Sequence, residues 1–269
     1  MIHRKNLIKL IEANGYRHSS WQVFSDFVEM AAIGISNTVD LAQRDAREAR
    51  YLEIVKRYER DEIDRFPQMF AELVMEMEAG PADVLGDVFM EMELSSKWHG
   101  QFFTPMPVCQ LMAGMMVDDR MRELIAERGF IRANEPACGG GAMIIALATE
   151  MKSAGINYQQ NLHVVAQDVD FKAVCMAYVQ LSLLHIPAVV VHGNTLTMEC
   201  RSQWLTPAHV MGGWSWRLRA AERRDIDPAT AEVAKRAEAI VIDDPMVLQP
   251  PCLPASVPPT AVDHQLSLF

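Results

Sequence analysis

The sequence contains no run of apolar residues long enough to cross a membrane, a span that requires about 20 residues. Its first residues, MIHRKNLIKLIEANGY, carry charge but have neither the apolar core nor the cleavage site of a signal peptide. These two absences predict a cytoplasmic protein without a membrane partner.

Paired cysteines and an excess of basic residues are also missing. None of the five cysteines forms a Cys-x-x-Cys pair, so we expect reduced thiols, no disulfide framework and no zinc cluster or other metal site. Lys and Arg number 25 against 35 Asp and Glu, a net charge of -10. This balance excludes a protein that coats DNA generally, so any nucleic-acid contact must use a local basic surface.

The 269 residues, 50% of them hydrophobic, are enough for one sizeable α/β domain and a smaller lobe. Residues 1–97 are predicted to form an N-terminal helical lobe. Within it, Pro67 and Pro81 are expected to open helices, and Gly80 to end the first of them.

Residues 98–247 differ in character from the lobe. Short β-rich runs at 163–168, 188–193 and 238–244 alternate with helical segments, which predicts an α/β domain with a parallel sheet and crossover helices. A long insert occupies about 197–237. The remainder, 248–269, is a proline-rich tail that is expected to be a semi-extended tether.

A triple glycine in the stretch EPACGGGAM suggests a binding loop. Gly139, Gly140 and Gly141 let the backbone turn sharply before a helix. Asp168 ends the next expected strand, at the position where doubly wound folds hold the hydroxyls of a ribose. Loop and acid together predict a nucleoside cofactor. Asp170 is interpreted as the cap of the following helix.

Four segments in this order resemble the motifs of adenine-N6 DNA methyltransferases. They are GQFFTP (100–105), EPACGGGAM (135–143), AQDVD (166–170) and HGNTL (192–196). The resemblance, which spans roughly residues 80–200, is to the modification subunit of type I restriction systems and its plasmid- or phage-type relatives. It implies a Rossmann-like methyltransferase fold with an N-terminal helical lobe and S-adenosylmethionine as cofactor.

The resemblance also implies which residues bind the cofactor. Glu135 and Asn194 stand where the family has Asp, and the side-chain oxygen of Asn194 is expected to accept from the adenine amino group. The full implied set is Phe103, Thr104, Glu135, Ala137, Gly139, Gly141, Asp168 and Asn194.

The catalytic loop departs from the family pattern. That family follows its fourth strand with Asn/Asp/Ser-Pro-Pro and an aromatic, which hold and stack the extruded base. Here the corresponding residues are Asp243, Asp244, Pro245 and Met246. Asp243 still offers an acceptor, but loss of the stacking ring removes about 1–3 kcal/mol of base binding. We therefore expect weak activity.

The insert combines aromatic and basic side chains, a composition suited to stacking bases and holding phosphates. The predicted DNA contacts are Trp214, Trp216, Arg217 and Arg219. The alternative is that the tryptophans anchor the insert to the core while the arginines are solvated.

The last residues, QLSLF, resemble the peptide with which bacterial DNA polymerases and repair proteins bind the replication sliding clamp. In that interpretation Gln265 lies at the rim of an apolar cleft that Leu266, Leu268 and Phe269 fill. The alternative is a tail that folds back on its own domain.

These observations predict a DNA adenine-N6 methyltransferase that docks on the sliding clamp. A competing interpretation is a catalytically silent relative that binds DNA or the clamp as an interaction module. Methylation of a protein glutamine or of a small molecule is a third.

Overall fold

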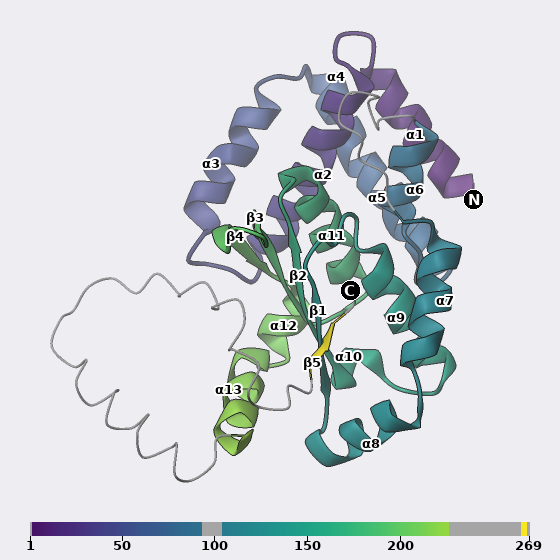
Figure 1. Ribbon diagram of the computed structural model, residues 1–269. Helices are drawn as coiled ribbons and strands as arrows, with labels where there is room; N and C mark the ends of the chain where they lie inside the picture. Colours follow the sequence, from purple (N-terminus) through teal and green to yellow (C-terminus); the bar gives the residue numbers. More distant parts are fainter. Residues whose placement is uncertain (1, 93–103, 226–264, 268–269) are drawn as a thin grey trace, which may run out of the picture.

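The structure is a computed structural model that describes residues 2–92, 104–225 and 265–267. Up to residue 92 the described chain is helical (Figure 1). The helices are α1 (Ile2–Asn14), α2 (Ser20–Ser36), α3 (Arg44–Val55), α4 (Arg60–Ile63), α5 (Arg65–Glu78) and α6 (Val84–Glu91). The predicted helical character of the N-terminal part is confirmed as far as residue 92, and 93–97 lie outside the described residues.

Local sequence decides where α5 ends and α6 begins. Gly80, at a φ of +139°, follows the C-cap of α5, as expected. The expectation that Pro81 opens α6 is wrong, because the cap is Asp83, whose Oδ1 accepts a hydrogen bond from Gly86 N at 3.0 Å. A cap of this kind satisfies an N–H of the first turn. Any side chain at Gly86 would collide with the capping carboxylate.

The described strands form one sheet in the order β4-β3-β2-β1-β5. They are β1 (Ile131–Glu135), β2 (Leu162–Asp168), β3 (Ala188–Asn194), β4 (Glu199–Leu205) and β5 (Gln265–Ser267). All neighbours are parallel except β3 and β4, which are antiparallel. The predicted strands at 163–168 and 188–193 are confirmed as β2 and β3, whereas 238–244 lies outside the described residues.

The expected insert begins as part of the sheet. It supplies β4, then α12 (Pro207–Met211) and α13 (Trp214–Asp225). The sequence ECRSQWL did not indicate a strand, because it lacks the alternation of apolar and polar residues that a half-buried strand shows. Only one residue of β4, Trp204, is buried. Arg47 of α3 holds β4 in place: its guanidinium lies 4.0 Å from the Trp204 ring centre and donates to Gln203 O at 2.8 Å.

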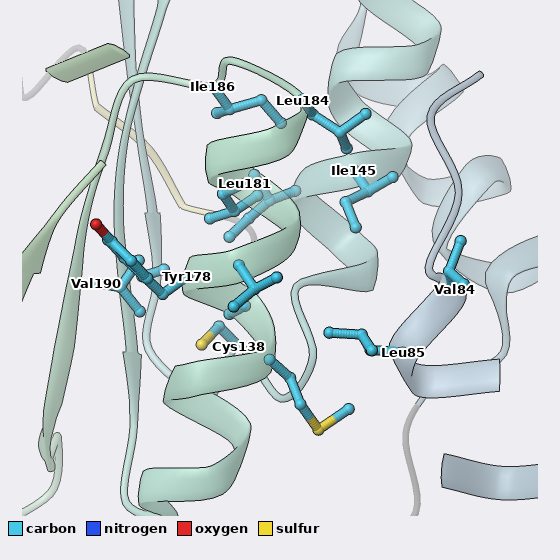
Figure 2. Packing of buried hydrophobic residues seen from close by; sticks show 14 of the residues in the cluster. Val84, Leu85, Cys138, Ile145, Tyr178, Leu181, Leu184, Ile186 and Val190 are labelled. Carbon is cyan, nitrogen blue, oxygen red and sulfur yellow. The ribbon is translucent and has the colours of Figure 1, made fainter. Parts of the chain in front are cut away.

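Helices α9 (Ala142–Ser153) and α11 (Phe171–Leu183) connect β1 to β2 and β2 to β3. Val190 of β3, Leu181 of α11 and Ile145 of α9 belong to one apolar cluster (Figure 2). Val84 and Leu85 of α6 belong to the same cluster, so the helical lobe and the sheet share one core. The other described helices are α7 (Met106–Met116), α8 (Asp119–Arg128) and α10 (Tyr158–Asn161).

Helix α13 is attached to the start of the strands by Trp214, which is 1% exposed. Its ring meets Phe130 edge-on at 5.1 Å and lies 5.3 Å from His163, near the beginnings of β1 and β2. His163 in turn shares a 2.9 Å hydrogen bond with His209 of α12. Burial lowers the pKa of His209 to about 4, so this histidine pair is neutral at physiological pH.

Cys109, Cys138 and Cys175 are buried free thiols, as expected. Cys200 is instead disulfide-bonded, so the expectation of reduced thiols is wrong for that residue. Among the described helices, none has the length and apolar character required to cross a membrane.

Replacing Trp214 with alanine should destabilise the fold by about 3–5 kcal/mol, because the change leaves a cavity between α13 and the sheet. The matched control is Trp216→Ala, two positions away on the same helix and 71% exposed, which should change the free energy of unfolding by less than about 0.5 kcal/mol. Urea unfolding followed by circular dichroism measures both. Equal effects would show that Trp214 does not anchor the helix.

Candidate cofactor site

Three polar residues end three neighbouring parallel strands. Glu135 is the last residue of β1, Asp168 of β2 and Asn194 of β3. Because the carboxyl ends of parallel strands meet at one edge of a sheet, these side chains gather there, where open α/β sheets bind their ligands. Each of the three is in the set predicted from the sequence.

The glycine loop follows β1 at this edge. Gly139 and Gly141 have φ angles of +52° and +95°, in the left-handed region that favours glycine, and α9 begins directly after them. Cys138 N donates to Gln167 O of β2 at 2.8 Å, and Gly141 N donates to Cys138 O at 2.8 Å. The loop is therefore tied to the neighbouring strand and turned back on itself.

The middle glycine is held by α11, which is itself hydrogen-bonded to the helical lobe. The fully buried side chain of Gln180 on α11 donates to Gly140 O and to Asp83 Oδ1, both at 2.8 Å, while its own oxygen accepts from Leu85 N at 3.0 Å. Burial raises the pKa of Asp83. A Cβ at Gly140 would lie 3.2 Å from the Asp83 carboxylate. Sequence reasoning missed this bridge, since Asp83 and Gln180 are ninety-seven positions apart.

Asp168 faces the loop with both oxygens engaged by backbone. Oδ2 accepts from Gly139 N and Oδ1 from Asp170 N, each at 2.9 Å. Each carboxylate oxygen can accept a second hydrogen bond, so the group is oriented by the loop without being saturated. Burial raises its pKa. Asp170 caps α11 by accepting from Lys172 N, as predicted.

Glu135 is completely buried. Its Oε1 accepts from Ala137 N at 3.1 Å, whereas Oε2 has no hydrogen-bond partner within the described parts of the chain. Burial, with a smaller effect from the Asp168 charge, raises the pKa of Glu135 to about 7. A buried acceptor without a partner costs about 1–3 kcal/mol, so a ligand that brings a donor or a positive charge here removes that cost.

Asn194 differs from the expectation in one respect. Its side-chain oxygen accepts from Leu196 N at 3.0 Å and from Thr197 N at 3.4 Å. Because a carbonyl oxygen has two lone pairs, the group that it presents to a ligand is the Nδ2 donor. Thr195 ties the same turn to the loop by donating to Pro136 O at 2.7 Å.

One further residue belongs at this edge. Val169 directly follows Asp168 and is 55% exposed, an apolar side chain at the edge where the polar groups meet. The sequence could have indicated Val169, because this residue directly follows Asp168, the acid predicted to bind the ribose.

The structure brings together only part of the predicted set. Thr104 is exposed just before α7, and its carbonyl accepts from Cys109 Sγ at 3.6 Å. Phe103 and the predicted catalytic residues Asp243, Asp244, Pro245 and Met246 lie outside the described residues.

The predicted DNA contacts lie at the other end of the strands. Arg217 lies 3.7 Å from the centre of the Trp214 ring and donates to Gln160 O at 3.1 Å, before β2 begins. Since β2 has seven residues, about 20 Å of strand separates that end from the glycine loop. The prediction that Trp214 stacks on a base is wrong, because its ring is buried against the body. Trp216 and Arg219 are exposed.

Residues 81–217 match the family described as N-6 DNA methylase. The match covers half of the chain, so the chain belongs to this family. Its cofactor is S-adenosylmethionine, the methyl donor of that family.

Two of the solved structures that resemble the chain are the following. A Listeria monocytogenes protein described as a class I S-adenosylmethionine-dependent methyltransferase has 13% identity and a TM-score of 0.36 over 71% of this chain and 53% of its own. The methyltransferase subunit of a type I restriction-modification system from Streptococcus thermophilus has 19% identity and a TM-score of 0.34, over 66% of this chain and 40% of its own. The chain thus spans about half or less of each. No curated protein matches it.

The groups at the strand ends fit this cofactor. S-adenosylmethionine carries an ammonium and a sulfonium, and Glu135 Oε2 is a buried acceptor without a partner among the described residues. The charge of Asp168 contributes to the raised pKa of Glu135 and so opposes ionisation of this carboxyl group. A positively charged ligand reverses that effect.

The stability of the protein without cofactor should depend on Glu135. Because its folded pKa is raised from 4.5 to about 7, the folded state binds the extra proton between these values, and stability falls as the pH rises through them. Glu135→Gln should remove this loss, which reaches up to about 3 kcal/mol.

Urea unfolding of both proteins at pH 5 and pH 8 measures the effect. Between pH 5 and pH 8 the wild type should lose more stability than the variant. The glutamine side chain can change the stability of the variant, but by the same amount at both pH values. Parallel behaviour of the two proteins would contradict a raised pKa at Glu135.

Proposed function

We propose that the protein transfers a methyl group from S-adenosylmethionine to the N6 atom of adenine in DNA. The observation that carries the proposal is the buried Glu135 Oε2, which has no hydrogen-bond partner among the residues that the structure describes and lies beside a glycine loop, in a chain of the N-6 DNA methylase family. Bound S-adenosylmethionine supplies an electrophilic methyl group on a positively charged sulfur.

Different residues at the strand ends bind different parts of the cofactor. Glu135 accepts from the methionyl ammonium, and the backbone at Ala137, Gly139 and Gly141 allows close approach of the ligand. Asp168 accepts from the ribose hydroxyls with the lone pairs that Gly139 N and Asp170 N leave. Phe103 and Thr104 lie at the methionine end in this proposal.

Val169 would offer an apolar surface to the adenine ring of the cofactor, and the Nδ2 of Asn194 would donate to a nitrogen of that ring. This reverses the direction of the hydrogen bond expected from the sequence, because the Asn194 oxygen already accepts twice.

The target base is held by the loop Asp243–Met246. Asp243 accepts from the amino group and so increases electron density on N6, while Asp244 replaces the first proline of the family pattern and Met246 replaces its aromatic ring. Without a ring to stack on, the extruded base is bound more weakly by about 1–3 kcal/mol. Turnover is therefore slow.

DNA contact by the insert is assigned to its exposed residues. Trp216 and Arg219 are on the outside of α13, about 20 Å of strand away from the cofactor edge. They would contact the duplex at a distance from the flipped base, not the base itself. The buried Trp214 supports α13 from behind.

The C-terminal residues supply a docking peptide for the sliding clamp. Gln265 positions the chain at the rim of the clamp groove, and Leu266, Leu268 and Phe269 fill it, as in other extended peptides that bind preformed grooves. The support for this assignment is the sequence QLSLF at the end of a proline-rich segment.

Cofactor binding should depend on the Asp168 charge. Asp168→Ala is expected to weaken S-adenosylmethionine binding by about 1.5–3 kcal/mol, the contribution of a hydrogen bond to a charged group. Asp170→Ala is the matched control, since that carboxylate caps α11 and its loss should cost about 1 kcal/mol of stability with little change in affinity. Isothermal titration calorimetry measures both, and equal affinity of the Asp168 variant and the wild type would remove this residue from the site.

Methyl transfer is tested with tritiated S-adenosylmethionine and unmethylated genomic DNA. We expect slow incorporation, found as N6-methyladenine after digestion, and its loss in Asp243→Ala. Incorporation that survives this substitution would place the catalytic loop elsewhere. If cofactor binds but no DNA is methylated, the silent interaction module is the better description.

Clamp docking is tested with a synthetic QLSLF peptide and a purified bacterial clamp. Three apolar side chains contribute at most about 1.5–3 kcal/mol each, and ordering the tail opposes much of this, so we expect a Kd in the micromolar range. Alanine in place of the residues at 268 and 269 should abolish the signal in a fluorescence anisotropy titration. A peptide that never binds would contradict the assignment.

A further inference from the structure

The outer edge of β1 is occupied by the C-terminal end of the chain. β5, drawn in yellow beside β1 in Figure 1, pairs with it in parallel, with Arg132 opposite Gln265, Ala133 opposite Leu266 and Asn134 opposite Ser267. The chain thus returns to its first strand with three residues of the same peptide that is proposed to bind the clamp.

β1 requires a neighbour on this side. Its inward residues Ile131, Ala133 and Glu135 are buried, and its other edge is paired with β2 along its whole length. A parallel strand with one edge left open exposes N–H and C=O groups beside an apolar core, where each unpaired group costs free energy and invites another strand. β5 satisfies part of this edge.

One backbone cannot occupy both places. A peptide that binds a groove in extended form uses its main chain as well as its side chains, and the main chain of residues 265–267 is paired with β1. Docking on β1 and docking on the clamp are therefore mutually exclusive for these residues.

We propose that residues 265–267 form a two-position strand, docked on β1 in the free protein and released from β1 when the tail binds the clamp. This inference rests on the proposed clamp docking. Its consequence is that the folded domain lowers the affinity of its own tail: if the strand is docked nine-tenths of the time, the full chain binds the clamp about tenfold more weakly than the free peptide.

The same geometry couples the tail to the cofactor edge. Ser267 is opposite Asn134, and the next residue of β1 is Glu135, whose carboxylate lies at the glycine loop. Although the tail was predicted from the sequence to be a semi-extended tether, Ser267 pairs with the residue of β1 that directly precedes Glu135. A cofactor that orders this end of β1 changes the equilibrium between docked and released β5. By linkage, clamp binding then changes the affinity for the cofactor by the same factor.

The test is a reversible crosslink between the two strands in the full-length protein. Neighbouring strands are about 4.8 Å apart, within the Cα separation that a disulfide requires, so Asn134→Cys with Ser267→Cys should crosslink within one chain on oxidation. Neither position belongs to the proposed cofactor, catalytic or clamp-contacting residues. The matched control is Arg132→Cys with Ser267→Cys, which is two residues out of register and should not crosslink.

Clamp affinity is then compared between the oxidised and reduced forms of the first variant. Oxidation should lower it at least tenfold, and reductant should restore it, while the control pair should show no change. A crosslink that leaves clamp binding unchanged, one that forms only between two chains, or none at all would each overturn the two-position strand.

A second measurement uses the unmodified protein. Saturating clamp should increase hydrogen exchange at the amides of residues 132–134, and unchanged exchange with bound clamp would contradict release. Failure of clamp docking itself has a different signature, since the free QLSLF peptide would then show no binding even though the crosslink forms.

Discussion

The side chain of Gln180 connects the three parts of the molecule on which the site depends. It donates to the carbonyl of Gly140 in the loop, donates to Asp83 at the start of α6, and accepts from Leu85. A buried amide with its donors and acceptor satisfied holds its neighbours in one arrangement, because any shift leaves a polar group unpaired. The position of the glycine loop is thus decided jointly by the helical lobe and by the crossover helix α11.

Around this loop the electrostatics are arranged for a positive ligand. Glu135 and Asp168 are both buried carboxyl groups with raised pKa values, and within the described part of the chain no basic side chain forms an ion pair with either. Backbone N–H groups orient Asp168, and one N–H orients Glu135. Such an arrangement is costly in the empty protein and favourable once a cation is bound, which relates the stability of the edge to the occupation of the site.

The two ends of the strands have different tasks. At their beginnings, Trp214, Phe130 and the neutral pair His163 and His209 form a buried aromatic cluster that attaches α13. At their carboxyl ends lie the loop and the polar residues. Between these ends, β5 adds a strand at the edge of β1, which brings the last residues of the chain next to the first residues of the site. The short segment that is proposed to bind the clamp is thus also an extension of the sheet.

The strands β2 and β3, the turn at Gly139–Gly141 and the acid Asp168 were predictable from the sequence, because each depends on local features: apolar runs of strand length, residues that tolerate positive φ, and a carboxylate at the end of a strand. Tertiary structure alone decided the rest. β4 has too few buried apolar residues to be predicted as a strand from the sequence. Its position depends on Arg47 of α3, which is distant in the chain. The burial of Trp214 follows from what α13 packs against, since the same tryptophan and arginine pattern suits a DNA surface equally well. The bridge from Asp83 to Gly140 and the pairing of β5 with β1 join residues far apart in the chain, and their energies arise only when folding has removed water from between them.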